Sequence, residues 1–523
     1  MSRALPPRRA PVRGALAASL LVATLGLGAC HSMAPSYQRP AAPVPAALPW
    51  PAAASAPAAA AAAAGASAPA GSPEATAPGQ VGWSWRAFVR QPRQAKLVEL
   101  ALANNRDLRS AVLAVERARA LLDVSSADRL PTLGAGLGAS RAPSPVNGKQ
   151  TSTYTAGLQV SAWEVDVFGR IASQNDAAQA QWMATEAARG SAELSLAAAL
   201  LAVDLNLAAD ARQLAIAERS LASRRDTLRL TQLRERVGAA SVLELQAAHS
   251  LVAQAEVAQV QAARQRQLDL NALHLLAGAV VPAELLPPAP EPLPMAVPPG
   301  PAGPGAMPAA TAAATVAAAA AAADDVAWTQ AFAEVPAGLG SDVLLQRPDV
   351  LQAEHLLVAA TANIGAARAA FWPRITLTGS AGLASGQLGN LLQAGSFGWS
   401  IAGQALATVF DSGRNSANLK VGEVNRELAV AAYEKALQSA FRETADALAG
   451  LQSWREQVAA QLRLRDASAD TVRLTELRHS RGAASELERL DAQRSLLAAE
   501  QALVATRLAE AQNRVALFKA LGR

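Results

Sequence analysis

Apolar residues alternate with small or polar residues in four short stretches of this chain, at about 131–140, 153–163, 374–384 and 397–409. Alternation with a period of two places every second side chain on one face of a β-strand. A polar loop, 142–149, separates the first two stretches, so the four predict two β-hairpins. Each strand has about ten residues, the length that a tilted strand needs to cross a bilayer.

Long segments with helical spacing follow each predicted β-hairpin. The first helical hairpin covers about 171–276 and the second about 413–520. Apolar residues recur every seven positions in both, at Leu200, Leu207, Leu214, Leu221 and Leu228, and at Leu490, Leu497, Val504, Ala511 and Phe518. This repeat predicts helices that pack along a coiled-coil seam, and the longest helix would reach roughly 100 Å.

The string Gly-Ala-Ala-Ser separates the outgoing helix from the returning helix in both segments, at 238–241 and at 482–485. Glycine relieves the strain of a tight reversal, and serine can cap the helix that follows. We therefore predict that both strings form the tips of helical hairpins.

The two halves match at a nearly constant offset, which predicts a tandem duplication. Pro131 and Pro373 are 242 residues apart, as are Phe168 and Phe410. Arg170 and Arg414 are 244 apart, as are Gly238 and Gly482. The predicted repeats cover 83–281 and 328–523, joined by a Pro/Ala-rich linker at 282–327.

The N-terminus has the features of a bacterial lipoprotein. A basic segment and an apolar segment precede Leu27-Gly28-Ala29-Cys30, which resembles a lipobox. We predict a signal peptide at 1–29, lipidation of Cys30 and an Ala/Pro-rich flexible tether at 30–82. His31 in place of Asp favours sorting to the outer membrane. The alternative is an ordinary signal peptide with an incidental cysteine.

Composition limits the classes of function. The net charge is +5, but the arginines are scattered and aromatic residues are only 4% of the chain, which argues against nucleic-acid binding. A single cysteine excludes a disulfide framework. The five histidines have no metal-ligand spacing and no phosphate loop occurs. We therefore expect no enzyme, no catalytic residue, no cofactor and no metal.

Four strands cannot enclose an aqueous lumen, and an open sheet edge is not viable in lipid. The strands must therefore be shared between copies of the chain. Three copies would supply twelve strands, whereas these considerations alone leave a dimer with eight strands open. The aromatic residues that flank the strands could form interfacial belts, at Tyr154, Trp163, Trp372 and Trp399.

Several motifs together resemble those of TolC-like outer-membrane efflux factors of tripartite RND pumps, in particular the lipoprotein (NodT-type) branch. They are Trp163–Arg170, Arg347–Val350 with Glu354, Ala366–Pro373, Val409–Arg414, Ala440–Leu448 and Leu490–Arg494. The resemblance implies a homotrimer with a twelve-stranded membrane β-barrel and a long α-helical tunnel in the periplasm. It implies docking to a periplasmic membrane-fusion adaptor and an inner-membrane RND pump, and transport of drugs or other small toxic compounds. Glu235 and His479 stand where the family often has an aromatic residue.

Two sets of site residues follow from the resemblance. Leu487, Asp491 and Arg494 match positions that constrict the closed periplasmic end, and their spacing places them on one helical face. The alternative is an ordinary exposed ion pair that contributes about 0.3–0.5 kcal/mol. The residues expected to dock the adaptor are those of the tips, Arg236, Gly238, Ser241, Arg481, Gly482 and Ser485.

Two other functions stay open at this point. One is the outer-membrane channel of a type I protein secretion system. The other is a lipid-anchored periplasmic scaffold or adaptor with coiled coils, which would leave four strands of membrane-spanning length unexplained. On the favoured interpretation the chain is lipid-anchored in the Gram-negative outer membrane and extends into the periplasm.

Overall fold

The computed structural model describes residues 32–50, 84–143, 148, 150–288, 331–335 and 338–522. The predicted signal peptide and Cys30 lie outside the described residues. So do most of the predicted linker 282–327 and residues 51–82 of the predicted tether.

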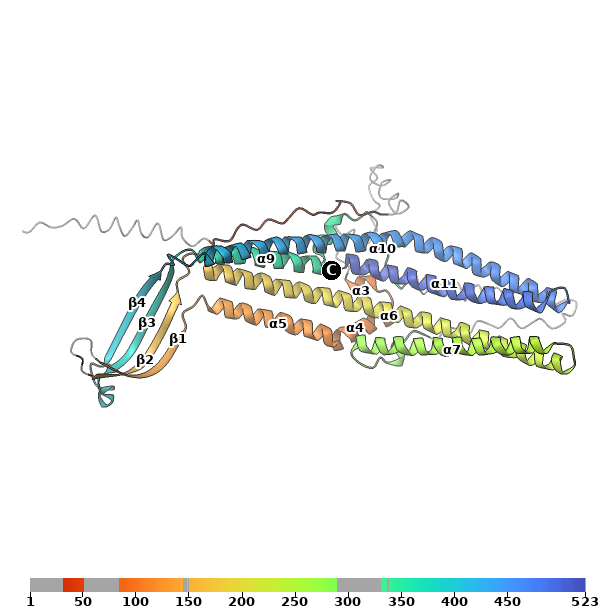
Figure 1. Cartoon of the computed structure of the whole chain (residues 1–523), viewed down its shortest axis with the longest axis horizontal. Helices are drawn as coiled ribbons and strands as arrows, with labels where there is room; N and C mark the ends of the chain where they lie inside the picture. The colour runs from red at the N-terminus through yellow and green to blue at the C-terminus, as the bar shows by residue number, and fades with distance from the viewer. Residues whose placement is uncertain are drawn as a thin grey trace, which may run out of the picture. The chain divides into compact units, whose positions relative to one another are not determined.

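Both halves of the chain contain, in the same order, a helix, two strands, a long outgoing helix and a returning helix (Figure 1). The first half contains α3 (Trp85–Phe88), α4 (Pro92–Asn104), α5 (Arg106–Ala127), β1 (Leu133–Pro143), β2 (Gln150–Glu164), α6 (Arg170–Arg236), α7 (Val242–Ala277) and the 3-10 helix η1 (Ala283–Leu285). The second half contains η2 (Ser341–Gln346), α9 (Pro348–Ala369), β3 (Arg374–Ser385), η3 (Leu388–Asn390), β4 (Phe397–Leu406), α10 (Arg414–Ser480) and α11 (Glu486–Leu521). Both outgoing helices, α6 and α10, have 67 residues, and both returning helices, α7 and α11, have 36.

The strand ends differ from the predicted ones for two physical reasons. Arg141 pairs with Ser152 and Pro143 with Gln150, so β1 extends into the predicted polar loop and β2 begins at Gln150, before the predicted start at about 153. Backbone pairing does not require apolar side chains. In contrast, β4 ends at Leu406 instead of 409, because its partner strand begins at Arg374, the residue paired with Leu406.

The described residues form two compact units, each of which takes segments from both halves. The first unit comprises the residues up to Ala41, Leu113–Ala187 and Leu351–Lys435. The second comprises Ala42–Val112, Ala188–Val350 and the residues from Ala436 onward. The predicted repeats are two duplicated stretches of the sequence, whereas the compact units are groups of residues in contact with one another. The boundaries of repeats and units therefore differ.

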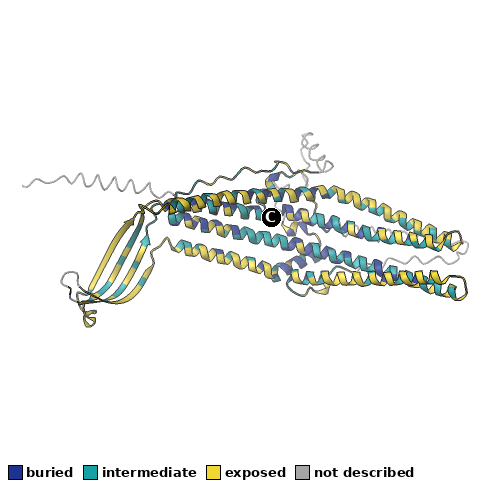
Figure 2. Ribbon diagram, viewed as in Figure 1, coloured by how far each residue is buried: buried dark blue, intermediate teal, exposed yellow. Residues whose placement is uncertain are grey.

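The first unit contains an antiparallel sheet with the strand order β1-β2-β3-β4. The register of β2 on β3 shifts between Val160 and Trp163, where Ala162 has a φ of 48°. Large apolar side chains on the strands are exposed, among them Leu137, Trp399 and Ile401. Figure 2 shows that much of the sheet surface is exposed, in contrast to the buried stripes along the helices. Within the part of the chain that the structure describes, β1 and β4 have one unpaired edge each.

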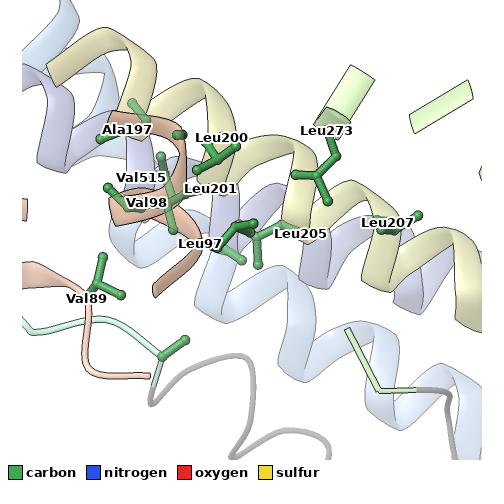
Figure 3. Close-up of a cluster of buried hydrophobic side chains, with 14 of the residues drawn as sticks. Val89, Leu97, Val98, Ala197, Leu200, Leu201, Leu205, Leu207, Leu273 and Val515 are labelled. Carbon is green, nitrogen blue, oxygen red and sulfur yellow. The ribbon is translucent and has the colours of Figure 1, made fainter. Parts of the chain in front are cut away.

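The second unit holds the main hydrophobic core (Figure 3). Leu97 from α4, Leu200 and Leu201 from α6, and Leu273 from α7 are fully buried. Leu200, Leu207 and Leu221 of the predicted seven-residue seam are all buried. Phe88 stacks on Phe332 and on Phe518, with ring centroids 4.8 and 4.4 Å apart. The seam residues therefore hold helices together, as their spacing predicts.

Among the described residues, α6 alone is long and apolar enough to cross a membrane as a helix. Half of its most apolar 18-residue window is buried inside the protein. That burial is typical of a core helix, so α6 is interpreted as part of the helix packing.

The prediction of a flexible tether does not hold for residues 32–50. In the first unit, Arg39 donates to both carboxylate oxygens of Glu354 at 2.7 and 2.8 Å, and the Tyr37 hydroxyl donates to Glu354 at 3.0 Å. In the second unit, Leu48 is buried and the Ser341 hydroxyl donates to the carbonyl of Pro45. The Ala/Pro-rich composition predicted a flexible tether because it does not register a few side chains that bind specific partners elsewhere in the chain.

Candidate channel gate and docking tips

Both helical hairpins turn with the same backbone hydrogen bonds. At the first tip, Gly238 N–H donates to the carbonyl of Glu235, and Ala239 N–H donates to that of Arg234. At the second tip, Gly482 N–H donates to the carbonyl of His479, and Ala483 N–H donates to that of Arg478. These are the two bonds of a Schellman motif, which ends a helix with a left-handed residue. Each string therefore forms a hairpin tip.

Glycine is required at the tips by backbone conformation. Gly238 and Gly482 have φ values of 73° and 75°, in the left-handed region that residues with a Cβ rarely adopt. A Cβ added at either glycine would meet no atom within 4 Å. The space around both tips is therefore open.

A serine caps the returning helix at each tip. Ser241 accepts from the N–H of Glu244 at 3.1 Å, and the Glu244 carboxylate accepts from the N–H of Ser241 at 3.0 Å. This reciprocal pair is a complete capping box. Ser485 accepts from the N–H of Glu488 at 3.2 Å, and its hydroxyl also donates to the Glu488 carboxylate. All six tip residues singled out from the sequence are exposed: Arg236, Gly238, Ser241, Arg481, Gly482 and Ser485.

The three gate candidates lie on α11, shortly after the second tip. Arg494 donates to the carboxylate of Asp491, and both side chains are largely exposed. Leu487 is 77% exposed, one helical turn before Asp491. An apolar side chain and an ion pair therefore project from this stretch of α11.

The matching stretch of α7 has the same exposure without the charges. Leu243, Ala247 and Ser250 stand at the positions of Leu487, Asp491 and Arg494, and all three are exposed. The two hairpins thus have the same backbone conformation at their tips and differ in the side chains that follow.

A second polar network at the α11 start was not predicted from the sequence. Glu486 pairs with Arg489 and with His479, the latter with Oε2 and Nε2 3.1 Å apart. Arg489 also donates to the hydroxyl of Thr227 on α6 at 3.4 Å. The spacing of Glu486 and Arg489 could have indicated their pairing. The contact with Thr227 joins residues 262 positions apart and leaves no local pattern in the sequence.

Further side-chain contacts tie α6 to α11. Gln512 donates to Asn206 at 2.7 Å, Gln213 donates to the carbonyl of Gln501 at 3.2 Å, and Arg219 pairs with Glu500 at 3.4 Å. The two hairpins of one chain are therefore joined along these helices, and the Arg489–Thr227 bond lies near the tips.

One acidic pair lies between the helices of the first hairpin. Burial and the neighbouring Asp269 carboxyl on α7 raise the pKa of Asp210 to about 7, while Arg266 acts in the opposite direction. Within the ranges that the structure describes, no three His, Cys, Asp or Glu side chains are grouped as metal ligands would be.

Comparison with known proteins assigns the chain to a family. The model of the family described as outer membrane efflux protein matches residues 97–279 and 339–523. The probable efflux pump outer membrane protein TtgC of Pseudomonas putida is 36% identical over 510 residues, which cover 96% of this chain and 94% of that protein. Outer membrane protein OprJ of Pseudomonas aeruginosa is 36% identical over 514 residues, covering 97% and 96%.

Solved structures show the same fold. A crystal structure of a membrane protein from Pseudomonas aeruginosa matches with a TM-score of 0.77 and 34% identity, covering 94% of this chain and 100% of that one. The open state of the Neisseria gonorrhoeae MtrE outer membrane channel matches with a TM-score of 0.74 and 31% identity, covering 94% and 98%. The names of TtgC and MtrE describe a pump component and a channel, not enzymes.

The resemblance to outer-membrane efflux factors is thereby confirmed, as is the predicted class of fold. The chain belongs to the outer membrane efflux protein family and is an outer-membrane component of an efflux system in a Gram-negative bacterium.

Proposed function

We propose that three copies of this chain form the outer-membrane duct of a tripartite efflux system for drugs, solvents or other small toxic compounds. Relatives in Pseudomonas putida are named as toluene, solvent and antibiotic efflux pump outer membrane proteins. Their names support the class of cargo.

The sheet with two open edges is the observation that carries this proposal. Among the strands of the described residues, β1 and β4 each have an unpaired edge, and Leu137, Trp399 and Ile401 project as lipid-facing residues would. Unpaired backbone groups are too costly in lipid, so β4 of one copy has to pair with β1 of another. Three sheets of four strands would close a twelve-stranded barrel.

Oligomer size and conduction test this proposal together. Outer membranes that contain the chain should show a species of three chains on SDS gels without heating, which boiling converts to one chain. The purified species should conduct ions across planar bilayers, and deletion of the chain should sensitise the host to a panel of drugs and solvents. A monomer without conductance would contradict the proposal.

The proposed partners are a periplasmic membrane-fusion adaptor and an inner-membrane RND pump. The tips suit adaptor docking, because their six singled-out residues are exposed and their backbone is fixed by the same bonds in both hairpins. A photoreactive residue at Ser241 or Ser485 should crosslink a co-expressed adaptor. A matched probe at the exposed Leu464, in the body of α10, should not. Equal crosslinking from Leu464 would argue against docking at the tips.

The proposed membrane attachment includes a lipid on Cys30, the only cysteine of the chain. Radiolabelled palmitate should be incorporated into the wild-type chain and not into a Cys30→Ser variant. Label retained in that variant would exclude Cys30 as the lipidated residue.

The proposed gate is formed by Leu487, Asp491 and Arg494 at the periplasmic entrance. Three copies of an exposed apolar residue and an ion pair around one axis would narrow the opening. Asp491→Ala should leave folding intact, raise single-channel conductance and increase entry of bulky antibiotics. Glu256→Ala is the matched control, since it removes an exposed ion pair with Arg225 from the first hairpin. Unchanged conductance in Asp491→Ala would contradict the gate and favour the alternative of an ordinary exposed ion pair.

A further inference from the structure

The junction between β2 and β3 is closed by side chains at the ends of the strands. Glu164, the last residue of β2, accepts two hydrogen bonds from Arg170 at 2.8 Å and pairs with Arg374, the first residue of β3. Four residues after β2, Phe168 stacks on Trp372, with ring centroids 5.2 Å apart and planes at 20°. Trp372 is followed by Pro373 and then by β3. Two strands from different halves of the chain therefore meet at an aromatic contact.

The same arrangement of residues recurs at the two outer strands, β1 and β4, but there the two halves of the contact do not meet within the part of the chain that the structure describes. Phe410 follows the last residue of β4 by four positions, as Phe168 follows β2. Leu130 precedes Pro131 before β1, as Trp372 precedes Pro373 before β3. In the single chain Phe410 is 86% exposed and Leu130 is 69% exposed. Each therefore presents an unpartnered half of a contact that is complete between β2 and β3.

We propose that Phe410 of one copy packs against Leu130 of the next copy, and that this contact closes each β4–β1 seam between copies. The inference rests on the proposed oligomer and assigns the residues that join its copies. It follows from the internal duplication: the seam inside the chain is a template for the seam between chains. The template specifies a second copy as the partner of Phe410. Leu130 is the residue that matches Trp372, and it precedes β1, the strand that pairs with β4 of the neighbouring copy.

The seam between copies has a different chemistry from the seam inside the chain. The positions that match Glu164 and Arg374, 242 residues away, are Leu406 and Thr132. Leu406 is exposed in the single chain, as is Val409. The seam between copies therefore lacks the ion pair and presents apolar residues. Its strength should change little with salt, since screening weakens charged contacts and not apolar ones.

Thiol crosslinking in outer membranes tests the contact. A Phe410→Cys/Leu130→Cys chain should give ladders of two and three linked chains with a short thiol crosslinker, and each single variant should not. Phe168→Cys/Trp372→Cys should link only within one chain, which verifies the chemistry. Phe410→Cys/Leu392→Cys is the matched control, because Leu392 is also 86% exposed but lies in the β3–β4 connection; it should not link.

A charge introduced at the seam gives a second readout. Phe410→Glu should lower the temperature at which the oligomer separates on SDS gels, and Leu392→Glu should not. Oligomers that form without the Phe410–Leu130 crosslink, and that tolerate Phe410→Glu, would overturn the seam and leave the proposed function standing. Wild-type chains that remain monomeric would overturn both.

Discussion

The second unit contains two equivalent hydrogen bonds, one in each half of the chain, and the two bonds have different donors. Asn105 donates from Nδ2 to the carbonyl of Leu276 at 2.9 Å. Arg347 donates from Nη1 to the carbonyl of Ala520 at 3.0 Å. The donors are 242 positions apart and the acceptors 244, the two offsets of the duplication. Each link joins the start of a short helix, α5 or α9, to the last turn of a returning helix.

The surroundings of the two donors show what changed after duplication. Asn105 also accepts from the N–H of Leu108 and so caps α5, whereas Arg347 also pairs with Asp349 and with Glu443 on α10. Both donors are buried. The first half thus uses a neutral amide between two helices, and the second uses a cation that joins three. The geometry of the link was kept while its chemistry diverged, as at the two tips.

The largest effect is expected when this link is removed from each half in turn. Arg347→Ala should lower the free energy of unfolding by about 2–4 kcal/mol, because a buried cation with several partners is lost and Glu443 is left unpaired. Asn105→Ala should cost about 1–2 kcal/mol, for one cap and one hydrogen bond. Thermal unfolding in detergent measures both. Equal losses would show that the added charges contribute nothing.

A smaller effect is expected at Glu354, which has no counterpart in the first half, where Val112 stands. Glu354→Ala should lower the free energy of unfolding by about 2 kcal/mol, because it removes the bidentate hydrogen bond from Arg39 and the hydrogen bond from Tyr37. It should also expose the backbone after Tyr37 to chymotrypsin. Val112→Ala is the control that should leave the cleavage rate unchanged. Cleavage as slow as in the wild type would mean that residues 32–50 are held by other contacts.

Substitution of the tip glycines should destabilise both hairpins equally, because the two tips have the same backbone conformation. Gly238→Ala and Gly482→Ala should each cost about 1 kcal/mol, because both place a Cβ on a left-handed residue without causing a collision. Thermal unfolding again gives the measurement. A much larger loss at Gly482 would show that the Glu486 network depends on the turn.

The last effect concerns pH and should come from the acidic pair of the first hairpin. Trp454 and Asn513 stand where the first half has Asp210 and Asp269, so the second hairpin lacks the acidic pair. Burial and the neighbouring Asp269 carboxyl raise the pKa of Asp210 from the usual 3.8 to about 7 in the folded chain. The folded state therefore holds a proton that the unfolded state has released, and stability falls as pH rises from about 4 to 7.

Asp210→Asn removes this dependence and should raise the unfolding temperature at pH 8 more than at pH 4. Asp226→Asn, which changes an exposed carboxylate on the same helix, is the control. A stabilisation of Asp210→Asn that is equal at both pH values would rule out titration of Asp210.

Local patterns predicted the strands, the long helices and the tips, because alternation, heptads and glycine turns are encoded within a few residues. The end of β4 was missed because it depends on where β3 begins. Residues 32–50 were interpreted by composition, which cannot show that Arg39 binds Glu354, 315 positions away. The contact of Arg489 with Thr227, 262 positions away, was missed for the same reason. The gate and docking residues came from the family resemblance, and the structure adds their exposure and pairing.

The equal lengths of the two hairpins restrict how such a chain can change in evolution. One inserted residue lengthens a helix by 1.5 Å and turns everything beyond it by about 100°, so the residues of the seven-position seam would leave their neighbours. A deletion in α6 alone would also separate Thr227 from Arg489. Related channels that span a wider or narrower periplasm should therefore differ by whole heptads, gained or lost together in α6, α7, α10 and α11.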